Sequence, residues 1–334
     1  MPARAGGCGR VAAVRVWRDF SEVPSDLGRT VVTIGNFDGM HLGHQHVVRR
    51  AREVAGEVGV DHVVAVTFDP HPIAVLRPEH APPTLTTIEE RLRLLLGTGE
   101  AGVDHVDSVL VIPFSRDIAA WTPAEFIQRI LLDTLHARAV VVGANFRFGN
   151  RAAGDCNLLR EAGRANDFVL EEVSLDGGPQ VWSSTYVRTC LAAGDVTGAA
   201  EALGRAFATR GIVVEGDKRG RELGYPTANV PVRPGAAAPA DGVYAGRLTV
   251  LDGPDAGSSY PAAISVGTNP TFAGERERRV ESYVLDRTDL ALYGREVEVA
   301  FVERLRGMVR FDSVDDLLKA MADDVARART ILAD

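Results

Sequence analysis

The sequence is poor in cysteine, in excess positive charge and in long apolar runs. Its three cysteines, Cys8, Cys156 and Cys190, are scattered and odd in number, so they give neither a disulfide framework nor a metal-ligand spacing. This use of cysteine predicts a reducing, cytoplasmic location. The formal net charge of -8 argues against broad binding to nucleic acid, although a small basic pocket for a nucleotide is compatible with it.

The apolar runs are too short for a membrane protein. None approaches the roughly 20 apolar residues that cross a bilayer, so no membrane partner is expected. Residues 1–12 lack the apolar core of a signal peptide and are expected to form an unstructured extension. From the sequence we therefore do not expect a secreted protein, a membrane-spanning protein or a protein that binds nucleic acid broadly.

The composition that remains is that of a globular protein. The chain has 334 residues, of which 46% are hydrophobic and 25% charged. This length suits two domains, and the pattern of the sequence changes near residue 205. We expect one domain over residues 14–198 and a second over residues 199–334.

The first domain alternates short apolar runs with amphipathic segments. Such alternation predicts a parallel sheet flanked by helices, which binds ligands at the carboxyl ends of its strands. Thr122, Pro123 and Glu125 suit the cap and first turn of one of these helices. The expected strands are 31–34, 63–68, 109–112 and 139–142, and the expected helices are 45–57, 87–97 and 122–135.

The most informative segment follows the first of these strands. His41 and His44 lie three residues apart at the start of the first helix, directly after a glycine turn. The turn consists of Gly35, Asn36, Phe37, Asp38 and Gly39. Helix N-termini favour phosphate and imidazoles can donate to phosphate oxygens, so the segment predicts a site for attack on the α-phosphate of a nucleoside triphosphate. The alternative is that these are surface or packing histidines, which is how we interpret His46 and His62.

Two further segments follow strands of the same predicted sheet. Asp69 and His71 come after the second strand, and Asn145 and Arg147 come after the fourth. Because parallel strands end at one edge of the sheet, we expect these residues to converge on the paired histidines.

A segment rich in hydroxyl groups lies near the end of this domain. Ser184 or Thr185 is the expected cap of a helix that runs to about Ala193 and ends at Gly194. Together with Arg188, these hydroxyls suit a phosphate clamp. The alternative is an ordinary capped helix with an exposed arginine.

The second domain contains short strand candidates separated by glycine and proline. This pattern predicts an antiparallel barrel or a sandwich. Ser313 begins an amphipathic helix that extends to Leu332 and is expected to cover one side of the strands. The expected strands are 210–215, 242–250, 261–266, 279–285 and 295–302.

A glycine-rich, basic loop over residues 216–224 can bring backbone N–H groups and cations to phosphate, although it lacks the Walker A pattern. Directly after it, Thr227 and Asn229 supply two oxygens at i and i+2, which share one face of an extended segment and suit Mg²⁺ bound to ATP. Glu281, inside an alternating strand, suits a general base. The alternatives are a turn-rich hairpin and a strand glutamate that faces solvent.

Together these motifs resemble the prokaryotic bifunctional riboflavin kinase/FAD synthetase family over about residues 14–330. The most specific part is Pro226-Thr227-Ala228-Asn229 in a chain that also carries an N-terminal His-x-Gly-His segment. The matching segments are 35–44, 67–72, 142–149, 183–188, 203–205, 220–229, 241–245, 267–272 and 292–294.

The resemblance implies a fold and two reactions. Residues 14–198 would form a Rossmann-like α/β nucleotidyltransferase domain that joins AMP from ATP to FMN and releases pyrophosphate. Residues 199–334 would form a six-stranded antiparallel β-barrel with a C-terminal helix that phosphorylates riboflavin to FMN. The implied cofactor is Mg²⁺, the small-molecule partners are riboflavin, FMN and ATP, and the expected state is a monomer or weak homo-oligomer.

The resemblance also implies roles for single residues. The implied catalytic residues are His41, His44, Asn145, Arg188 and, as base of the kinase, Glu281. Thr227 and Asn229 would hold the metal. The positions implied to bind nucleotide or flavin are Gly35, Asn36, Phe37, Asp38, Gly39, Asp69, His71, Arg147, Ser183, Ser184, Thr185, Gly216, Lys218, Gly220, Arg221, Gly224, Tyr225, Pro226, Tyr244, Thr268 and Asn269.

Two other functions are compatible with parts of the pattern. A nucleotidyltransferase with a degenerate barrel would leave the intact Thr227, Asn229 and Glu281 unexplained. A flavin carrier without ATP turnover would leave His41 and His44 unexplained. Trp182 and Tyr186 flank the hydroxyl segment where relatives usually carry other residues, and they bear on the flavin pocket.

Overall fold

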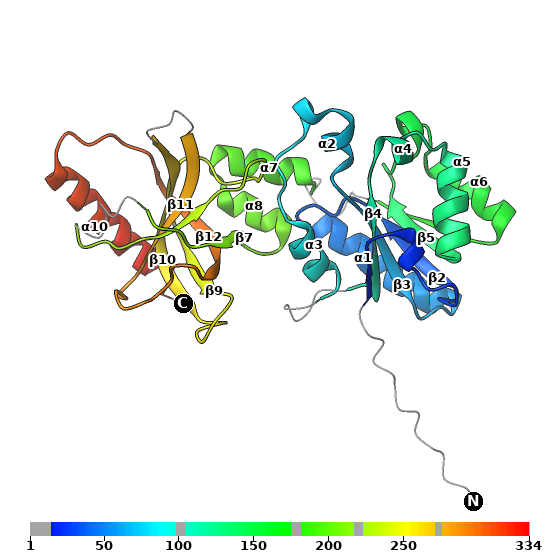
Figure 1. Ribbon diagram of the computed structural model, residues 1–334, viewed down its shortest axis with the longest axis horizontal. Coiled ribbons are helices and arrows are strands. Elements are labelled where there is room, and N and C mark those ends of the chain that lie inside the picture. The colour runs from blue at the N-terminus through cyan, green and yellow to red at the C-terminus, as the bar shows by residue number, and fades with distance from the viewer. Residues whose placement is uncertain (1–14, 98–104, 175–181, 217–222, 271–275, 334) are drawn as a thin grey trace, which may run out of the picture. The chain divides into compact units, whose positions relative to one another are not determined.

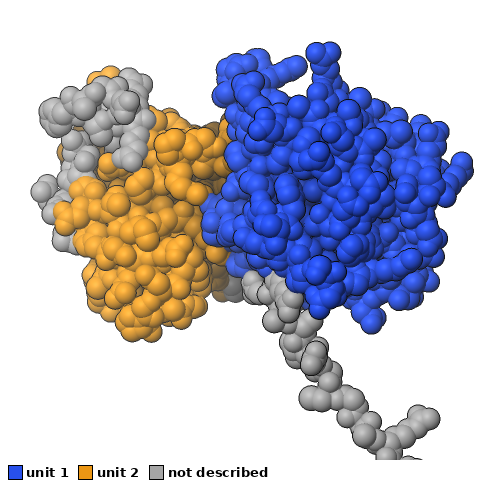
Figure 2. All heavy atoms as spheres, turned by 45° about the vertical axis from the view of Figure 1, so that its right-hand side comes forward, with its two compact units in different colours: residues 1–82, 86–181 blue, residues 83–85, 182–334 orange. Residues whose placement is uncertain are grey.

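The structure, a computed structural model, describes residues 15–97, 105–174, 182–216, 223–270 and 276–333 (Figure 1). The chain divides into two compact units (Figure 2). The first comprises Met1–Pro82 and Thr86–Val181, and the second comprises Pro83–Leu85 and Trp182–Asp334. None of the described helices combines the length and apolar character that crossing a bilayer requires.

The first unit is a parallel sheet with helices on both faces. Its strands lie in the order β1-β4-β3-β2-β5-β6, and every pairing between neighbours is parallel. Its elements are β1 (Arg15–Trp17), η1 (Phe20–Glu22), β2 (Thr30–Ile34), α1 (Leu42–Val58), β3 (Val63–Asp69), α2 (Pro72–Leu76), η2 (Pro78–His80), α3 (Ile88–Leu95), β4 (Ser108–Pro113), α4 (Arg116–Ala119), α5 (Pro123–Phe126), η3 (Ile127–Thr134), β5 (Ala137–Gly143), η4 (Asn150–Ala152), α6 (Cys156–Asn166) and β6 (Val169–Val173).

This strand order places a switch point beside β2. The chain runs from β2 through β3 to β4 on one side and then returns to β5 on the other side. Helices α1 and α3 pack on one face of the sheet, and η3 and α6 pack on the other. Ligands bind open parallel sheets at the carboxyl ends of the strands beside such a switch point. The fold therefore predicts a ligand site at the segments after β2 and β5.

The sequence predicted the four central strands and missed the two edge strands, β1 and β6. β1 has three residues, and β6 carries the consecutive charges Glu171 and Glu172, so neither gives a clear apolar pattern. In the helix predicted over 122–135, Thr122 is the N-cap as expected, and with Glu125 it forms a capping box. This helix does not stay regular, because it continues from α5 into the π-helical segment η3.

The second unit is built on one antiparallel sheet with the strand order β7-β12-β9-β10-β11-β8. A bridge between Val214 and Asn229, beyond β7 and in β8, joins the two edges, so the sheet is a nearly closed barrel and not a sandwich. Its elements are α7 (Ser184–Ala193), α8 (Val196–Leu203), β7 (Phe207–Ile212), β8 (Ala228–Pro231), β9 (Gly242–Val250), β10 (Ser259–Pro270), β11 (Arg276–Val284), β12 (Glu296–Gly307) and α10 (Val314–Ile331).

Helices complete the second unit. Side chains of α7 and α8 share the barrel core, and Leu85 joins the same cluster. Ser313 caps α10 as predicted, and this helix packs against the barrel through Ala328. The cap predicted for α7, Ser184 or Thr185, was wrong, because the N-cap is Ser183, which accepts a hydrogen bond from Tyr186 N–H. The functional boundary between residues 198 and 199 stays a prediction, since compactness alone assigns α7 and α8 to the second unit.

Candidate functional sites

The paired histidines lie at the N-terminus of α1, as the sequence predicted. His41 is the N-cap, and its Nδ1 accepts the backbone N–H of His44 at 3.4 Å. The two rings stack with 3.7 Å between their centroids. His41 is buried. The helix N-terminus and two imidazoles therefore meet at one point, a combination that suits phosphate oxygens.

His44 is neutral in this environment. Its Nδ1 is buried and finds no hydrogen-bond partner among the described residues. Burial lowers the pKa of His44 well below 6.5, and the nearby His41 and Arg91 lower it further. A neutral imidazole donates one N–H without bringing a full charge, so His44 can bind a phosphate oxygen across the physiological pH range.

The turn before the histidines is held by buried groups. Phe37 and Met40 have positive φ angles of 50° and 42° and are both buried, so the packed core fixes a conformation that these residues seldom adopt. Asp38, predicted to bind a nucleotide, is buried and accepts hydrogen bonds from the N–H and hydroxyl of Thr86 at 2.9 and 3.0 Å. These contacts make Asp38 a brace for the turn, and its direct contact with a ligand stays a prediction.

The structure brings two of the predicted segments together. His71, the N-cap of α2 after β3, lies with its Nε2 3.3 Å from Nδ2 of Asn36 in the turn after β2. Asp69 is exposed at the end of β3. The segments after β2 and β3 therefore share one edge of the sheet, as the parallel topology requires.

The remaining residues predicted for this site lie on two other segments. Asn145 and Arg147 are exposed after β5, the strand next to β2, and Arg147 lies 3.7 Å from the carboxylate of Asp155. Ser183 to Thr185 begin α7 of the second unit. There Arg188 donates through Nε to the carbonyl of Pro83 at 2.6 Å. The predicted joining of Arg188 with the histidines stays a prediction.

Sequence reasoning missed Arg91, Thr67 and Thr86 beneath this site. Arg91, on α3, is 3% exposed and donates to the hydroxyl of Thr67 and the carbonyl of Phe68. One signal was available: Arg91 lies three residues after Ile88 and four before Leu95, within the apolar stripe of its helix. A charged residue in such a stripe is buried with a partner or a function.

The second candidate site lies where β8 meets β11. Asn229 and Glu281 are directly opposed in the antiparallel pairing of these strands, so their side chains share one face of the barrel. Asn229 is buried, and its Nδ2 donates to the carbonyl and hydroxyl of Thr227 at 3.1 and 3.2 Å. The three residues predicted as metal ligands and base are thus brought together.

Gly216 belongs to the same cluster. A Cβ atom at Gly216 would lie 2.7 Å from the amide atoms of Asn229, so only glycine permits this approach. Lys218, Gly220 and Arg221, which the sequence assigns to the same loop, lie outside the described residues, as does the side chain of Asn269.

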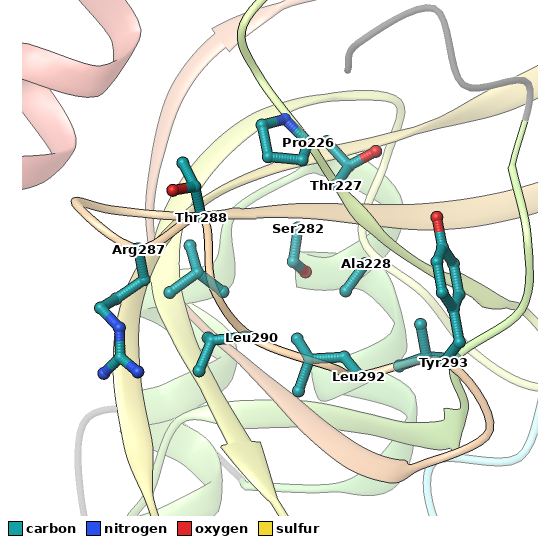
Figure 3. A pocket seen from close by; sticks show the side chains of 11 residues that line it. Pro226, Thr227, Ala228, Ser282, Arg287, Thr288, Leu290, Leu292 and Tyr293 are labelled. Carbon is teal, nitrogen blue, oxygen red and sulfur yellow. The ribbon is translucent and has the colours of Figure 1, made fainter.

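A small cavity opens beside Thr227 (Figure 3). Pro226 and Thr227 line one side of it, and Leu290 and Leu292 line the opposite side. Its complete lining is Val213, Pro226, Thr227, Ala228, Ser282, Val284, Arg287, Thr288, Leu290, Leu292 and Tyr293. An apolar wall next to a hydroxyl suits the flat ring of a nucleotide or a flavin.

Three tyrosines occupy different environments around this barrel. Tyr225, after the positive-φ Gly224, packs edge-to-face against Tyr283 with 5.1 Å between ring centroids. Tyr244, predicted to bind a ligand, is fully buried and its hydroxyl donates to the carbonyl of Ala240. Tyr244 therefore supports the core. Thr268 is exposed on β10.

The oxygens at the β8–β11 cluster fit Mg²⁺. The Asn229 amide packs against Gly216 and its nitrogen donates to Thr227, so the amide oxygen is the atom of this side chain that suits a metal. Neutral oxygens beside one carboxylate are a hard donor set, which Mg²⁺ prefers when phosphates supply its other ligands. No group of three or more His, Cys, Asp or Glu with metal-binding geometry occurs within the described ranges.

Comparisons with known proteins agree with this division into two sites. The family model for FAD synthetase matches residues 23–185, and that for riboflavin kinase matches residues 203–332. A protein from Pseudomonas fluorescens described as bifunctional riboflavin kinase/FMN adenylyltransferase is 39% identical over 306 residues, 91% of this chain and 93% of its own. One of the same description from Escherichia coli K12 is 36% identical over 318 residues, 95% of this chain and 96% of its own.

A solved structure shares the fold of the whole chain. The crystal structure described as a macrolide-efflux protein from Streptococcus pneumoniae has a TM-score of 0.82 and 30% identity, and the match covers 95% of this chain and 99% of that one. That description belongs to the pneumococcal protein, and what the two chains share is the fold.

Proposed function

Because this chain belongs to the bifunctional riboflavin kinase/FMN adenylyltransferase family, we propose a division of its two reactions between the two sites described above. The chain is a transferase that converts riboflavin to FMN and FMN to FAD. The adenylyl transfer belongs to the first unit and the phosphorylation of riboflavin to the second. ATP is the donor in both reactions.

In the first unit, His41 and His44 bind the phosphates of ATP at the start of α1. A phosphate oxygen of FMN attacks the α-phosphorus, the bond to the β-phosphate oxygen breaks, and pyrophosphate leaves. The neutral His44 donates to an oxygen that gains negative charge in this transition state. The observation that supports this role is the 3.7 Å stacking of both rings at a helix N-terminus. Asn145, Arg147 and Asp69 follow the ends of nearby strands of the same sheet and position the substrates.

In the second unit, Glu281 accepts the proton of the ribityl hydroxyl of riboflavin while that oxygen attacks the γ-phosphorus of ATP. Thr227 and Asn229 hold Mg²⁺, which neutralises phosphate charge when bound. The observation that supports this proposal is the pairing of β8 with β11. It places Asn229 directly opposite Glu281, so that the proposed metal ligand and the proposed base lie on one face of the sheet. The cavity beside Thr227, which polar and apolar side chains line together, is the place where part of one substrate would lie.

Product analysis by liquid chromatography tests the proposal. Purified protein with riboflavin, ATP and Mg²⁺ is expected to form FMN first and FAD afterwards, and a chelator is expected to stop both until Mg²⁺ is added in excess. FMN without FAD would contradict the assignment of the first unit. Turnover that persists in the chelator would contradict the metal role of Thr227 and Asn229.

A further inference from the structure

A buried arginine lies beneath the first site and has no place in the roles assigned so far. Arg91 projects from α3 between the turn after β2 and the end of β3. Its Nη1 donates to Thr67 Oγ1 at 3.3 Å and to the Phe68 carbonyl at 3.1 Å. Thr67 connects Arg91 to the turn after β2, because its hydroxyl donates to the carbonyl of Asn36 at 3.1 Å. The Arg91 guanidinium thus contacts the end of β3 directly and is connected to the turn after β2 through Thr67.

The electrostatic arrangement of Arg91 is unfavourable for a purely structural cation. Its nearest carboxylate, Asp38, is 4.0 Å away, and its Nε is buried without a hydrogen-bond partner among the described residues. Burial lowers the pKa of Arg91, while Asp38 and Asp69 raise it. A buried charge that is incompletely paired costs more than an apolar side chain of similar volume, so stability alone gives no reason for an arginine here.

We propose that Arg91 is a positioning residue for adenylyl transfer, which fixes the 35–44 turn and the end of β3 together and keeps positive charge behind the paired histidines. This inference rests on the function proposed for His41 and His44. Arg91 acts through Thr67, Asn36 and Asp38, because its own side chain is almost fully buried.

The charge of Arg91 has a measurable consequence at His44. The charged or titratable groups that shift the pKa of His44 are His41, from the start of α1, and Arg91, from α3, and Arg91 in turn interacts with Asp38 and Asp69. Removal of the cation leaves both carboxylates uncompensated, so protonation of His44 becomes easier. The acid limb of the pH profile, which is the fall in adenylyltransferase activity at low pH, should then move to higher pH.

The test compares Arg91→Met with Arg91→Lys in the full-length protein. Arg91→Met is expected to lower kcat/KM for ATP in FAD formation by about 10²-fold, as slight misplacement of a reacting group does, and to move the acid limb upward. Arg91→Lys, which keeps the charge, is expected to recover most of the rate with the limb unmoved. Arg93→Met is the matched control, because Arg93 lies on the same helix and pairs with Glu90.

Riboflavin kinase activity in the same molecule reports on folding of the second unit and should stay unchanged. Wild-type kinetics in Arg91→Met would overturn the proposal, and so would equal losses in both variants with an unmoved acid limb. If circular dichroism shows that Arg91→Met has lost helix, the first unit of this variant is misfolded. The variant Thr67→Val then tests the proposal in its place. It is expected to lower kcat/KM with the acid limb in place, and wild-type kinetics would overturn the role of the Arg91–Thr67–Asn36 connection. Absence of FAD from the wild-type protein would instead contradict the proposed function itself.

Discussion

At the residue scale, the paired histidines combine a ligand-binding position with a destabilising burial. His44 has a pKa well below 6.5, chiefly through burial and then through His41 and Arg91. Below about pH 6.5, His44 binds a proton in the unfolded chain but stays unprotonated in the folded chain. Folding stability therefore falls with decreasing pH by up to about 1.4 kcal/mol per unit until the folded pKa is reached, and above pH 6.5 this contribution is absent.

We therefore predict that His44→Gln makes the first unit less sensitive to acid. The free energy of unfolding of wild type and variant, measured with urea at pH 7.5 and pH 5.0, is expected to show a smaller decrease in the variant. His46→Gln is the control, because His46 is exposed on the same helix and should leave the decrease unchanged. Identical decreases in wild type and His44→Gln would show that His44 titrates normally in the folded protein.

Glu281 is the residue on which the kinase proposal depends most. Glu281→Gln keeps the size of the side chain and removes its basicity, so riboflavin phosphorylation is expected to slow by roughly 10²–10⁴-fold. Initial rates of FMN formation at saturating ATP measure this effect. Glu303→Gln, at an exposed strand glutamate, is the control. An unchanged rate in Glu281→Gln would remove Glu281 from the role of base.

At the scale of elements, the β8 edge depends on the absence of a side chain at Gly216. We predict that Gly216→Ala displaces the Asn229 amide, because the added Cβ would lie 2.7 Å from it, and weakens use of Mg²⁺ and ATP by the kinase by about tenfold or more. The KM for ATP at varied Mg²⁺ measures this. Gly56→Ala, where a Cβ meets open space, should change nothing in the kinase. A wild-type KM in Gly216→Ala would separate Gly216 from the site.

Elements with a local signature were predictable, and those defined by distant partners were not. The capping box at Thr122 and the cap at Ser313 are readable because their partners lie three residues away. β8 has four residues and is a strand because it pairs with β11, which no local pattern reveals. The switch from α5 to a π-helical segment likewise has no sequence signal that we can name.

The candidate sites follow the same rule. His41, His44, Thr227 and Asn229 could be predicted as site residues because their spacing is local and their chemistry is specific. Arg91 was missed because its contacts with Thr67 and Asp38 connect segments distant in sequence. Tyr244, which lies within a recognised motif, is buried in the core, and its contact with a ligand stays a prediction.

At the scale of the whole molecule, the two proposed sites belong to different compact units, so each reaction is expected to survive loss of the other. His41→Ala is expected to form FMN from riboflavin and no FAD, because it lacks a phosphate-binding imidazole but retains the barrel. Glu281→Gln is expected to form FAD readily when FMN is supplied and very slowly from riboflavin.

Mixing the two variants is the most direct test of this central claim. With riboflavin, ATP and Mg²⁺, an equimolar mixture of His41→Ala and Glu281→Gln is predicted to form FAD, since one variant supplies FMN and the other adenylylates it. Liquid chromatography of the products over time measures this against each variant alone. A mixture that forms no FAD, although both variants are folded, would contradict the assignment of the two reactions to two separate sites.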